Sequence, residues 1–293
     1  MTQILSDKSD LSDKSDLSDK SDHKVRNLPM EIWKPCSIPP DQWHIATVGP
    51  LTIRLRRRAD EWHIATERLD EEQHSKDMQP FAPCEPPDAE WQRWIVSENA
   101  VEARLLPVMP DYPVVVRPEF PLNIPSGARA LFFVSIPVWV RIIAQNGEPV
   151  TLCEEPTLIL SHTWFGEATA GEFCYALPST ARRKIDDSAR RPYRAICPVM
   201  LVNTSPKQLA FERLCIHVEG LAVYRGINHL WTNQLKVTSK AADEPNVVTF
   251  EKEAPSGESA GSEEIGEMLS EPRKRVTQSI LQRSFGAFRM FGI

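Results

Sequence analysis

The sequence predicts an all-β protein whose body is an antiparallel, β-sandwich-like arrangement of short strands. Short runs rich in Val, Ile, Phe, Tyr and Trp recur between residues 33 and 250, and turn-forming residues separate them. This spacing is typical of β-sandwiches and barrels. No amphipathic helix of roughly 10–15 residues intervenes, as βαβ units would require. The 25 prolines, against 12 glycines, lie largely between the runs, where they end strands without interrupting a central one.

Composition and charge narrow the class of protein. Of the 293 residues, 41% are hydrophobic, which is enough for a sizeable core. The formal net charge of −6 and the pI near 5.7 argue against nucleic acid as a partner. No apolar run approaches the roughly 18 residues of a membrane span, since the longest, Ala130–Val140, contains Ser135 and Pro137. The polar N-terminus has no signal-peptide core, so we expect a cytoplasmic protein.

Residues 1–32 are expected to be a disordered tail. Within them, residues 6–23 read SDKSDL, SDKSDL and SDKSDH, in which aspartate and lysine nearly balance and leucine is the only apolar residue. Such a segment cannot bury enough apolar surface to offset the entropy lost on ordering.

The body, residues 33–250, is expected to begin with a three-strand meander. Residues 43–47 and 62–66 both read WHIAT, and LTIRL at 51–55 lies between them, with turn residues on either side. Further strands are predicted at 114–116, 130–143, 157–161, 172–176, 193–202, 209–217, 221–224, 235–238 and 247–250. The pattern leaves open whether these strands form one sandwich or two lobes with a break near residues 145–156.

One predicted strand, residues 211–219, carries two metal-ligand residue types on a single face. Period-two alternation places Cys215 and His217 on one side and the aliphatic residues between them on the core side. His162 and Cys174, from neighbouring strands, are the candidates that would complete a zinc site. The six cysteines form no CxxC pair and mostly have apolar neighbours. We therefore expect buried, reduced thiols, with no metal and no cofactor.

Several residue strings are shared with a known family. They are TWFGEATAGEFCYAL at 163–177, ARR at 181–183, CPVMLVN at 197–203, FERLCIHV at 211–218 and LWTN at 230–233. Together they resemble the prokaryotic domain-of-unknown-function family 432, over about residues 50–238. The resemblance implies no activity, cofactor or catalytic residue, and the hexapeptide repeats lie outside it.

No catalytic motif stands out in the sequence. The chain has no GxSxG elbow, no papain-like cysteine string, and no GxGxxG or GxxxxGK(S/T) loop. Glu154 and Glu155, or Glu167 and Glu172, are the candidate carboxylate pairs of a carbohydrate-active or other hydrolase. Because such pairs are common by chance, a hydrolase using residues 154–172 is the alternative to a binding function.

Two basic clusters are candidate anion sites. The first is Arg54 with the run 56–58, at a strand end and turn. The second is a predicted loop around two aspartates, which also includes Arg194. Such clusters grip phosphate groups of a lipid, nucleotide or RNA, or else form solvated loops with weak ion pairs. The predicted anion-binding residues are Arg182, Arg183, Lys184, Arg190 and Arg191.

The end of the sequence predicts a linker followed by a helix. Residues 251–271 are acidic and rich in Ser and Gly, so we expect a disordered linker. Residues 272–293 are basic, and on a wheel of about 100° per residue they separate into an apolar and a polar face. This pattern is typical of helices that dock in a groove or on a membrane surface. The predicted partner-binding residues are Ile280, Leu281, Arg283, Phe285, Phe288 and Arg289.

The sequence therefore favours a non-catalytic binding or regulatory module. Its C-terminal helix would pack back onto the body, bind an unidentified protein partner or a second copy of the chain, or contact a membrane peripherally. Nucleic acid is not expected as a partner.

Overall fold

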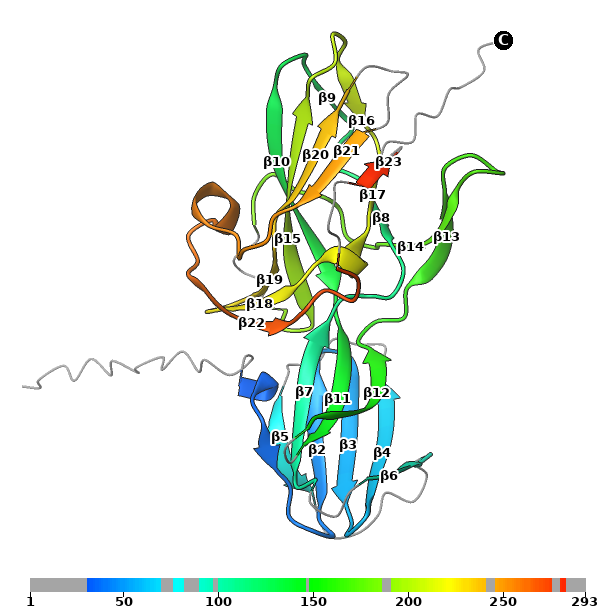
Figure 1. Cartoon of the computed structure of the whole chain (residues 1–293), viewed down its shortest axis with the longest axis vertical. Helices are drawn as coiled ribbons and strands as arrows, with labels where there is room; N and C mark the ends of the chain where they lie inside the picture. Colours follow the sequence, from blue (N-terminus) through cyan, green and yellow to red (C-terminus); the bar gives the residue numbers. More distant parts are fainter. Residues whose placement is uncertain are drawn as a thin grey trace, which may run out of the picture.

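The computed structural model describes residues 31–69, 76–81, 90–96, 100–145, 148–185, 191–240, 246–275 and 280–282. The described residues form strands and three short 3-10 helices: η1 (Glu31–Trp33), η2 (Val218–Gly220) and η3 (Gly257–Ala260). The all-β class is therefore confirmed. The molecule is elongated, with a small lobe and a large lobe that meet at a waist (Figure 1). The SDKSDL repeats lie outside the described residues.

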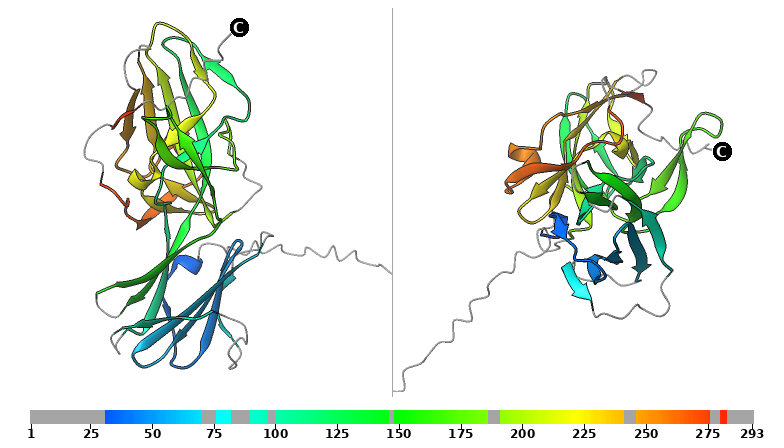
Figure 2. Two further views of the ribbon diagram at one scale, coloured as in Figure 1. Left: turned by 90° about the vertical axis from the view of Figure 1, so that its right-hand side faces the viewer. Right: turned by 60° about the horizontal axis from the view of Figure 1, so that its bottom comes forward.

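The small lobe consists of two sheets that face each other (Figure 2). The five-stranded sheet has the order β5 (Lys76–Phe81), β2 (Trp43–Val48), β3 (Leu51–Arg57), β4 (Glu61–Arg68) and β6 (Gln92–Ile95). The four-stranded sheet has the order β1 (Cys36–Ser37), β7 (Glu102–Val108), β11 (Trp139–Gln145) and β12 (Val150–Pro156). The predicted meander is confirmed, because β3 pairs antiparallel with both β2 and β4.

The large lobe contains an eight-stranded sheet that forks. Its central strand, β15 (Arg194–Asn203), pairs along its length with β10 (Arg129–Pro137). On its other side, the start of β15 pairs with β19 (Leu230–Thr232) and its end pairs with β20 (Leu235–Ser239). One arm continues through β18 (Val223–Gly226) to β22 (Ile265–Ser270), and the other through β21 (Asn246–Phe250) to β23 (Ile280–Gln282).

A smaller sheet covers the core of the large lobe. Its order is β13 (Ser161–Phe165), β14 (Glu172–Ala176), β8 (Val114–Val116) and β17 (Leu214–Ile216). One face of β8 and β17 contributes buried aliphatic side chains to the main core, which also holds side chains of β10 and β15. The other face carries Cys174, Cys215 and Phe165 in a separate small cluster. A two-stranded sheet joins β9 (Leu122–Ile124) to β16 (Leu209–Phe211).

The chain crosses the waist several times, so neither lobe is a continuous segment. A single residue, Val138, separates β10 in the large lobe from β11 in the small lobe (Figure 1). Two lobes are therefore present, but the break predicted near residues 145–156 is wrong. Gln145 ends β11, and residues 150–156 form β12, which pairs antiparallel with β11 in the small lobe.

The waist is closely packed around Tyr193. The buried hydroxyl of Thr157 donates a hydrogen bond of 2.5 Å to the carbonyl of Val138, whose amide donates to the carbonyl of Tyr193 at 3.0 Å. The Tyr193 ring lies against Gly49 in the turn between β2 and β3, where the backbone has φ = 60°. A Cβ at Gly49 would lie 2.3 Å from that ring. Both the positive φ and the contact therefore require glycine.

The predicted disordered linker, residues 251–271, is wrong. This segment contains η3 and β22, and β22 pairs antiparallel with β18 at one edge of the large sheet. Leu269 is buried in the main core, and the carboxylate of Glu263 is almost fully enclosed. The acidic composition hides these contacts because hydrogen bonds from residues distant in the sequence satisfy the buried carboxylate. The folded body thus extends to at least residue 275.

The predicted C-terminal helix is wrong where the structure describes it. Residues 280–282 form β23, which pairs antiparallel with β21 and places Ile280 opposite Val248. A segment that pairs with a sheet edge gains backbone hydrogen bonds to the neighbouring strand. A short isolated amphipathic helix has only its own hydrogen bonds and is marginally stable in water. Residues 276–279 and 283–293 lie outside the described residues. No helix within the described ranges is long and apolar enough to cross a membrane.

Candidate functional site

A pocket of about 400 Å³ lies beside β10 and the start of β15 in the large lobe. Its rim is formed by residues 178–185, which run along the free edge of β10. The amide of Phe133 donates to the carbonyl of Arg182 at 2.8 Å, and the amide of Arg182 donates to the carbonyl of Phe133 at 3.0 Å. This isolated bridge fixes the rim against the sheet.

The lining of the pocket combines positive charge with apolar surface. Four basic side chains line it, with no acidic residue in the described lining: Arg182, Lys184, Arg191 and Arg194. His229 lines it as well, and Phe133, Ile185 and Ile196 contribute apolar surface. The pocket is therefore cationic and partly hydrophobic.

Two of these side chains are buried and present unpartnered nitrogen atoms. Arg194 is 8% exposed and His229 is 6% exposed. The guanidinium of Arg194 donates a long hydrogen bond of 3.4 Å to the carbonyl of Ser135 and lies over the ring of Tyr193. Arg194 Nε and His229 Nε2 have no hydrogen-bond partner among the described residues. Buried polar atoms without partners are costly, and a water molecule or a ligand in the pocket would lower this cost.

A buried carboxylate orients His229. Nδ1 of His229 lies 2.7 Å from Oε2 of Glu263, and the backbone amide of His229 donates to Oε1 at 3.0 Å. The backbone amide of Asn228 and the indole of Trp231 also donate to Glu263. Burial alone would raise the pKa of Glu263, but these hydrogen bonds hold it below its usual value. The ionised carboxylate therefore holds Nδ1, and Nε2 is the ring nitrogen of His229 that has no partner among the described residues.

A second cluster lies on the outer face of the small sheet in the large lobe. The sulfur atoms of Cys174 in β14 and Cys215 in β17 are 3.7 Å apart. Cys215 Sγ is 3.5 Å from Oε1 of Glu172, and His217 Nε2 is 3.1 Å from the other oxygen of that carboxylate. Glu172, Cys174 and Cys215 place their potential ligand atoms within 4.8 Å of one another.

A family model described as a protein of unknown function (DUF432) matches residues 32–291. The chain belongs to the DUF432 family. The match confirms the resemblance found in the residue strings and extends it through β22 and β23. No curated protein and no solved structure matches the chain. Both the cationic pocket and the thiol cluster lie within the DUF432 match.

The predicted anion-binding residues are only partly brought together in this DUF432 fold. Arg182, Lys184 and Arg191 line the cationic pocket. Arg183 lines a neighbouring pocket of about 460 Å³ and donates to the carbonyl of Leu131 at 2.8 Å, so it anchors the rim. Arg190 lies outside the described residues. His229 was missed because its partner, Glu263, is far away in sequence.

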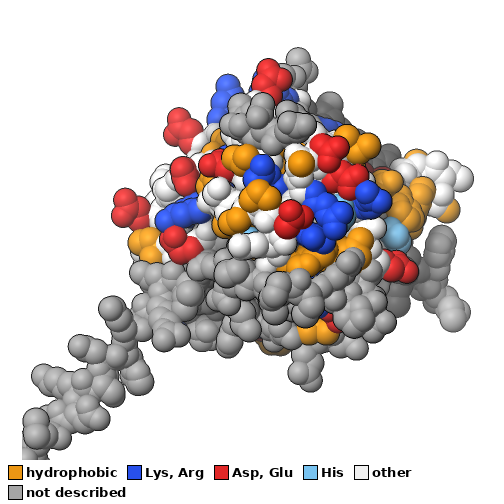
Figure 3. Space-filling view, turned by 90° about the horizontal axis from the view of Figure 1, so that it is seen from below, with side chains coloured by type: hydrophobic (Ala, Val, Ile, Leu, Met, Phe, Trp, Pro, Cys, Tyr) orange, Lys and Arg blue, Asp and Glu red, His pale blue; other side chains and the backbone are white. Residues whose placement is uncertain are grey.

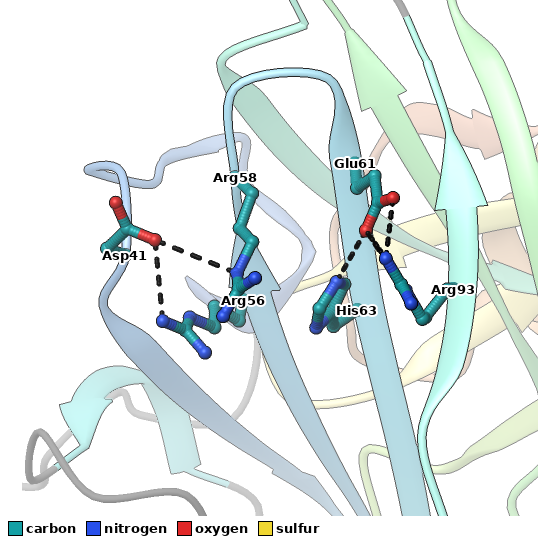
Figure 4. Close-up of polar contacts among 6 residues, drawn as sticks. All are labelled: Asp41, Arg56, Arg58, Glu61, His63 and Arg93. Carbon is teal, nitrogen blue, oxygen red and sulfur yellow. Dashed lines mark hydrogen bonds and ion pairs between the residues drawn. The ribbon is translucent and has the colours of Figure 1, made fainter.

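The other basic cluster is neutralised. In the small lobe, Asp41 lies 3.4 Å from Arg56 and 3.8 Å from Arg58 (Figure 4). Arg54 pairs with Glu67 at 2.7 Å. Seen from the end of the small lobe, acidic and basic side chains of the described residues are interspersed (Figure 3). This lobe therefore offers no concentrated positive charge on that view.

The candidate metal ligands are also partly brought together. Cys174 and Cys215 lie together, and His217 contacts Glu172, which lies beside both cysteines. Glu172 was not among the predicted metal ligands. His162 does not join, because its ring stacks on Phe173 and Tyr175, which alternate with Cys174 along β14. The signal available in the sequence was a Glu-x-Cys on one strand and a Cys-x-His on another.

The candidate carboxylate pair of residues 154 and 155 is held by arginines. Oxygens of Glu154 accept from Arg141 at 2.7 Å and from Arg273 at 2.5 Å, and Glu155 pairs with Arg68. Burial would raise the pKa of Glu154, but the two arginines hold it below its usual value. A carboxylate held ionised in this way is poorly suited to act as a general acid.

The predicted partner-binding residues fall largely outside the described part. Ile280 and Leu281 lie in β23 and pair with Val248 and Val247 within the same chain. The remaining four lie outside the described residues: Arg283, Phe285, Phe288 and Arg289.

Proposed function

We propose that this DUF432 protein is a non-catalytic cytoplasmic module that binds a small anionic ligand in the cationic pocket. One observation carries the proposal: Arg194 and His229, both more than nine-tenths buried, line the same pocket, and each has a nitrogen without a hydrogen-bond partner among the described residues. A buried guanidinium without an anion is costly, whereas an anion would satisfy both nitrogens.

The lining also favours a chemical class. Arg182, Lys184 and Arg191 surround the buried pair with further positive charge. Arginine is the residue best suited to bind phosphate and carboxylate. The apolar side chains, among them Phe133 and Ile196, favour a ligand whose anionic group is attached to an apolar part. The volume, about 400 Å³, lies within the usual range of small-molecule sites.

The alternative, a hydrolase using carboxylates of residues 154–172, has less support. Glu154 and Glu155 are paired with arginines, and Glu172 lies in the thiol cluster. No acidic side chain lines the cationic pocket among the described residues. A pocket of this kind can bind a phosphorylated compound, whereas general acid–base hydrolysis of a glycoside needs two suitably spaced carboxyl groups.

Isothermal titration calorimetry with inorganic phosphate and pyrophosphate at low salt tests the proposal. We expect one saturable site per chain, weakened by added salt. Arg194→Gln should lower the affinity by about 10- to 100-fold, since it removes a hydrogen bond to a charged group. Arg58→Gln is the matched control, because Arg58 is an exposed arginine in the other lobe.

Absence of binding by the wild-type protein, or equal affinities of both variants, would contradict the proposal. A phosphate group could come from a free metabolite or from a lipid head group. Co-flotation with vesicles containing phosphatidic acid, lost in Arg194→Gln, would identify the lipid source. Binding of soluble phosphates without flotation would identify a metabolite.

A further inference from the structure

The thiol cluster lies outside the cationic pocket and is assembled from two strands. β14 supplies Glu172 and Cys174 from one face, at positions i and i+2. β17 supplies Cys215, and His217 follows it two residues later on the same side. β8 lies between β14 and β17, and its Val115 packs against the two cysteines. Four chemically active side chains thus converge on the face that does not contribute to the main core.

Two of the three distances between these atoms match the edges of a metal coordination tetrahedron, and the third is within 4.8 Å. With Zn–S bonds of about 2.3 Å and Zn–O bonds of about 2.0–2.2 Å, tetrahedral ligands lie about 3.8 Å apart for S–S and about 3.5–3.7 Å apart for S–O. The Cys174–Cys215 sulfur distance is 3.7 Å, and the distance from Cys215 Sγ to Glu172 Oε1 is 3.5 Å. We propose that Glu172, Cys174 and Cys215 bind a thiophilic divalent cation, with Zn²⁺ as the ion that fits them.

A disulfide is the obvious alternative use of two neighbouring thiols, but the topology opposes it. Cys174 and Cys215 lie on strands that both pair with β8, so their backbones are two strand spacings apart. Two spacings of about 4.8 Å in a flat sheet place the Cα atoms beyond the limit of about 7 Å for a disulfide. The side chains reach toward a common point from opposite sides, as ligands of a shared ion do.

The environment suits a bound cation. Cys174 is 0% and Cys215 is 2% exposed, so the sulfur atoms are shielded from solvent. The Glu172 side chain is 33% exposed and provides a route for an ion to enter. Binding of a cation by the two thiols would release their protons. Three protein ligands leave a fourth position for water.

His217 acts as a positioning residue for Glu172. Its Nε2 lies 3.1 Å from Oε2 and 3.2 Å from Oε1 of Glu172, and Cys215 Sγ lies 3.5 Å from Oε1. His217 Nδ1 lies 3.3 Å from Glu219, and Glu219 is 3.5 Å from Lys274. The imidazole thus holds the Glu172 carboxylate beside Cys215. Such outer partners typically change metal affinity by about 10- to 100-fold.

Cobalt substitution and metal analysis test this site in the full-length protein. Purified under reducing conditions and titrated with Co²⁺, the protein should show thiolate-to-cobalt charge-transfer absorption that saturates at one equivalent. Zn²⁺ should abolish the absorption. Cys174→Ser and Cys215→Ser should each remove it, and His217→Gln should weaken Zn²⁺ binding by about 10- to 100-fold. The absorption reports ligation of the metal by the thiolates directly. If His217 had a purely structural role, its substitution would leave metal ligation unchanged.

Cys197→Ser is the matched control, because Cys197 is equally buried but lies in β15, outside the cluster. It should keep the wild-type absorption. If a serine variant fails to fold by circular dichroism, Glu172→Gln provides the test on the most accessible of the three ligands. The proposal is overturned if wild-type protein shows no thiolate–cobalt absorption, if the absorption survives both cysteine substitutions, or if Cys174 and Cys215 form a disulfide in the native protein.

Discussion

Arg273 forms an ion pair with Glu154, with 2.5 Å between Nη2 and Oε2. Its Nε donates to the carbonyl of Met109 at 2.6 Å, and its guanidinium lies 5.5 Å from the centre of the Trp139 ring. The hydroxyl of Ser270 donates to the carbonyl of Pro107 at 2.5 Å. A segment that reads as a tail in the sequence therefore connects the large lobe to strands of the small lobe.

The Arg273 contact should contribute measurably to stability. Arg273→Ala leaves Glu154 partly buried with only Arg141 as its partner, so we expect a loss of about 1–3 kcal/mol in the free energy of unfolding. Urea denaturation measures the loss. Arg275→Ala is the control, since its pair with Glu271 is exposed and should contribute less than about 1 kcal/mol. Equal losses in the two variants would show that Arg273 does not join the lobes.

Gly49 provides a second test of the waist. Gly49→Ala forces a Cβ into the Tyr193 ring, and we expect a loss of about 1–3 kcal/mol from overpacking in addition to backbone strain. Gly127→Ala is the matched control, because Gly127 also has a positive φ but its added Cβ meets no atom within 4 Å. Thermal or urea unfolding of both variants separates the two effects. A loss at Gly127 as large as that at Gly49 would contradict the close contact.

Acid should weaken the protein through its buried carboxylates. The pKa values of Glu154 and Glu263 are depressed in the folded state. Groups with depressed folded pKa values stabilise the protein above their unfolded pKa, about 4.3 for glutamate, and this stabilisation is lost as the pH falls through the folded pKa. The free energy of unfolding should therefore fall below about pH 4.5.

Urea titrations at several pH values between neutrality and acid measure this dependence. Glu263→Gln should be less stable at neutral pH and should show a shallower decline in acid, because it lacks one of the responsible groups. The exposed Glu258 is the control position, and Glu258→Gln should follow the wild-type curve. A Glu263→Gln decline as steep as that of the wild type would show that Glu263 contributes nothing to the acid response.

Local patterns predicted the parts of the fold that depend on local contacts. The meander of β2, β3 and β4 follows from alternation and short turns, both visible within about two dozen residues. Residues 211–219 alternate as expected, but the structure divides them into β16, β17 and η2. Even so, Cys215 lies on the outer face and its aliphatic neighbours lie in the core, as period-two alternation requires.

The contacts that were missed are distant in sequence. In the sequence, β22 and β23 look like a linker and a helix. Only beside their partners, β18 and β21, can they be recognised as the strands that complete the two arms of the large sheet. The cationic pocket was visible as a run of arginines, but His229 was not, because Glu263 orients it from 34 residues away. The thiol cluster likewise needed β8 to bring β14 and β17 together.

The most direct test of anion binding in the cationic pocket is a crystal structure of the protein with selenate, located by the anomalous scattering of selenium. The account predicts an anomalous selenium peak in the pocket, with selenate oxygens at hydrogen-bond distance, about 2.7–3.2 Å, from Arg194 Nε and His229 Nε2. The peak should disappear in Arg194→Gln. Selenate bound only at exposed side chains outside the pocket, or an unchanged peak in the variant, would contradict the proposed function.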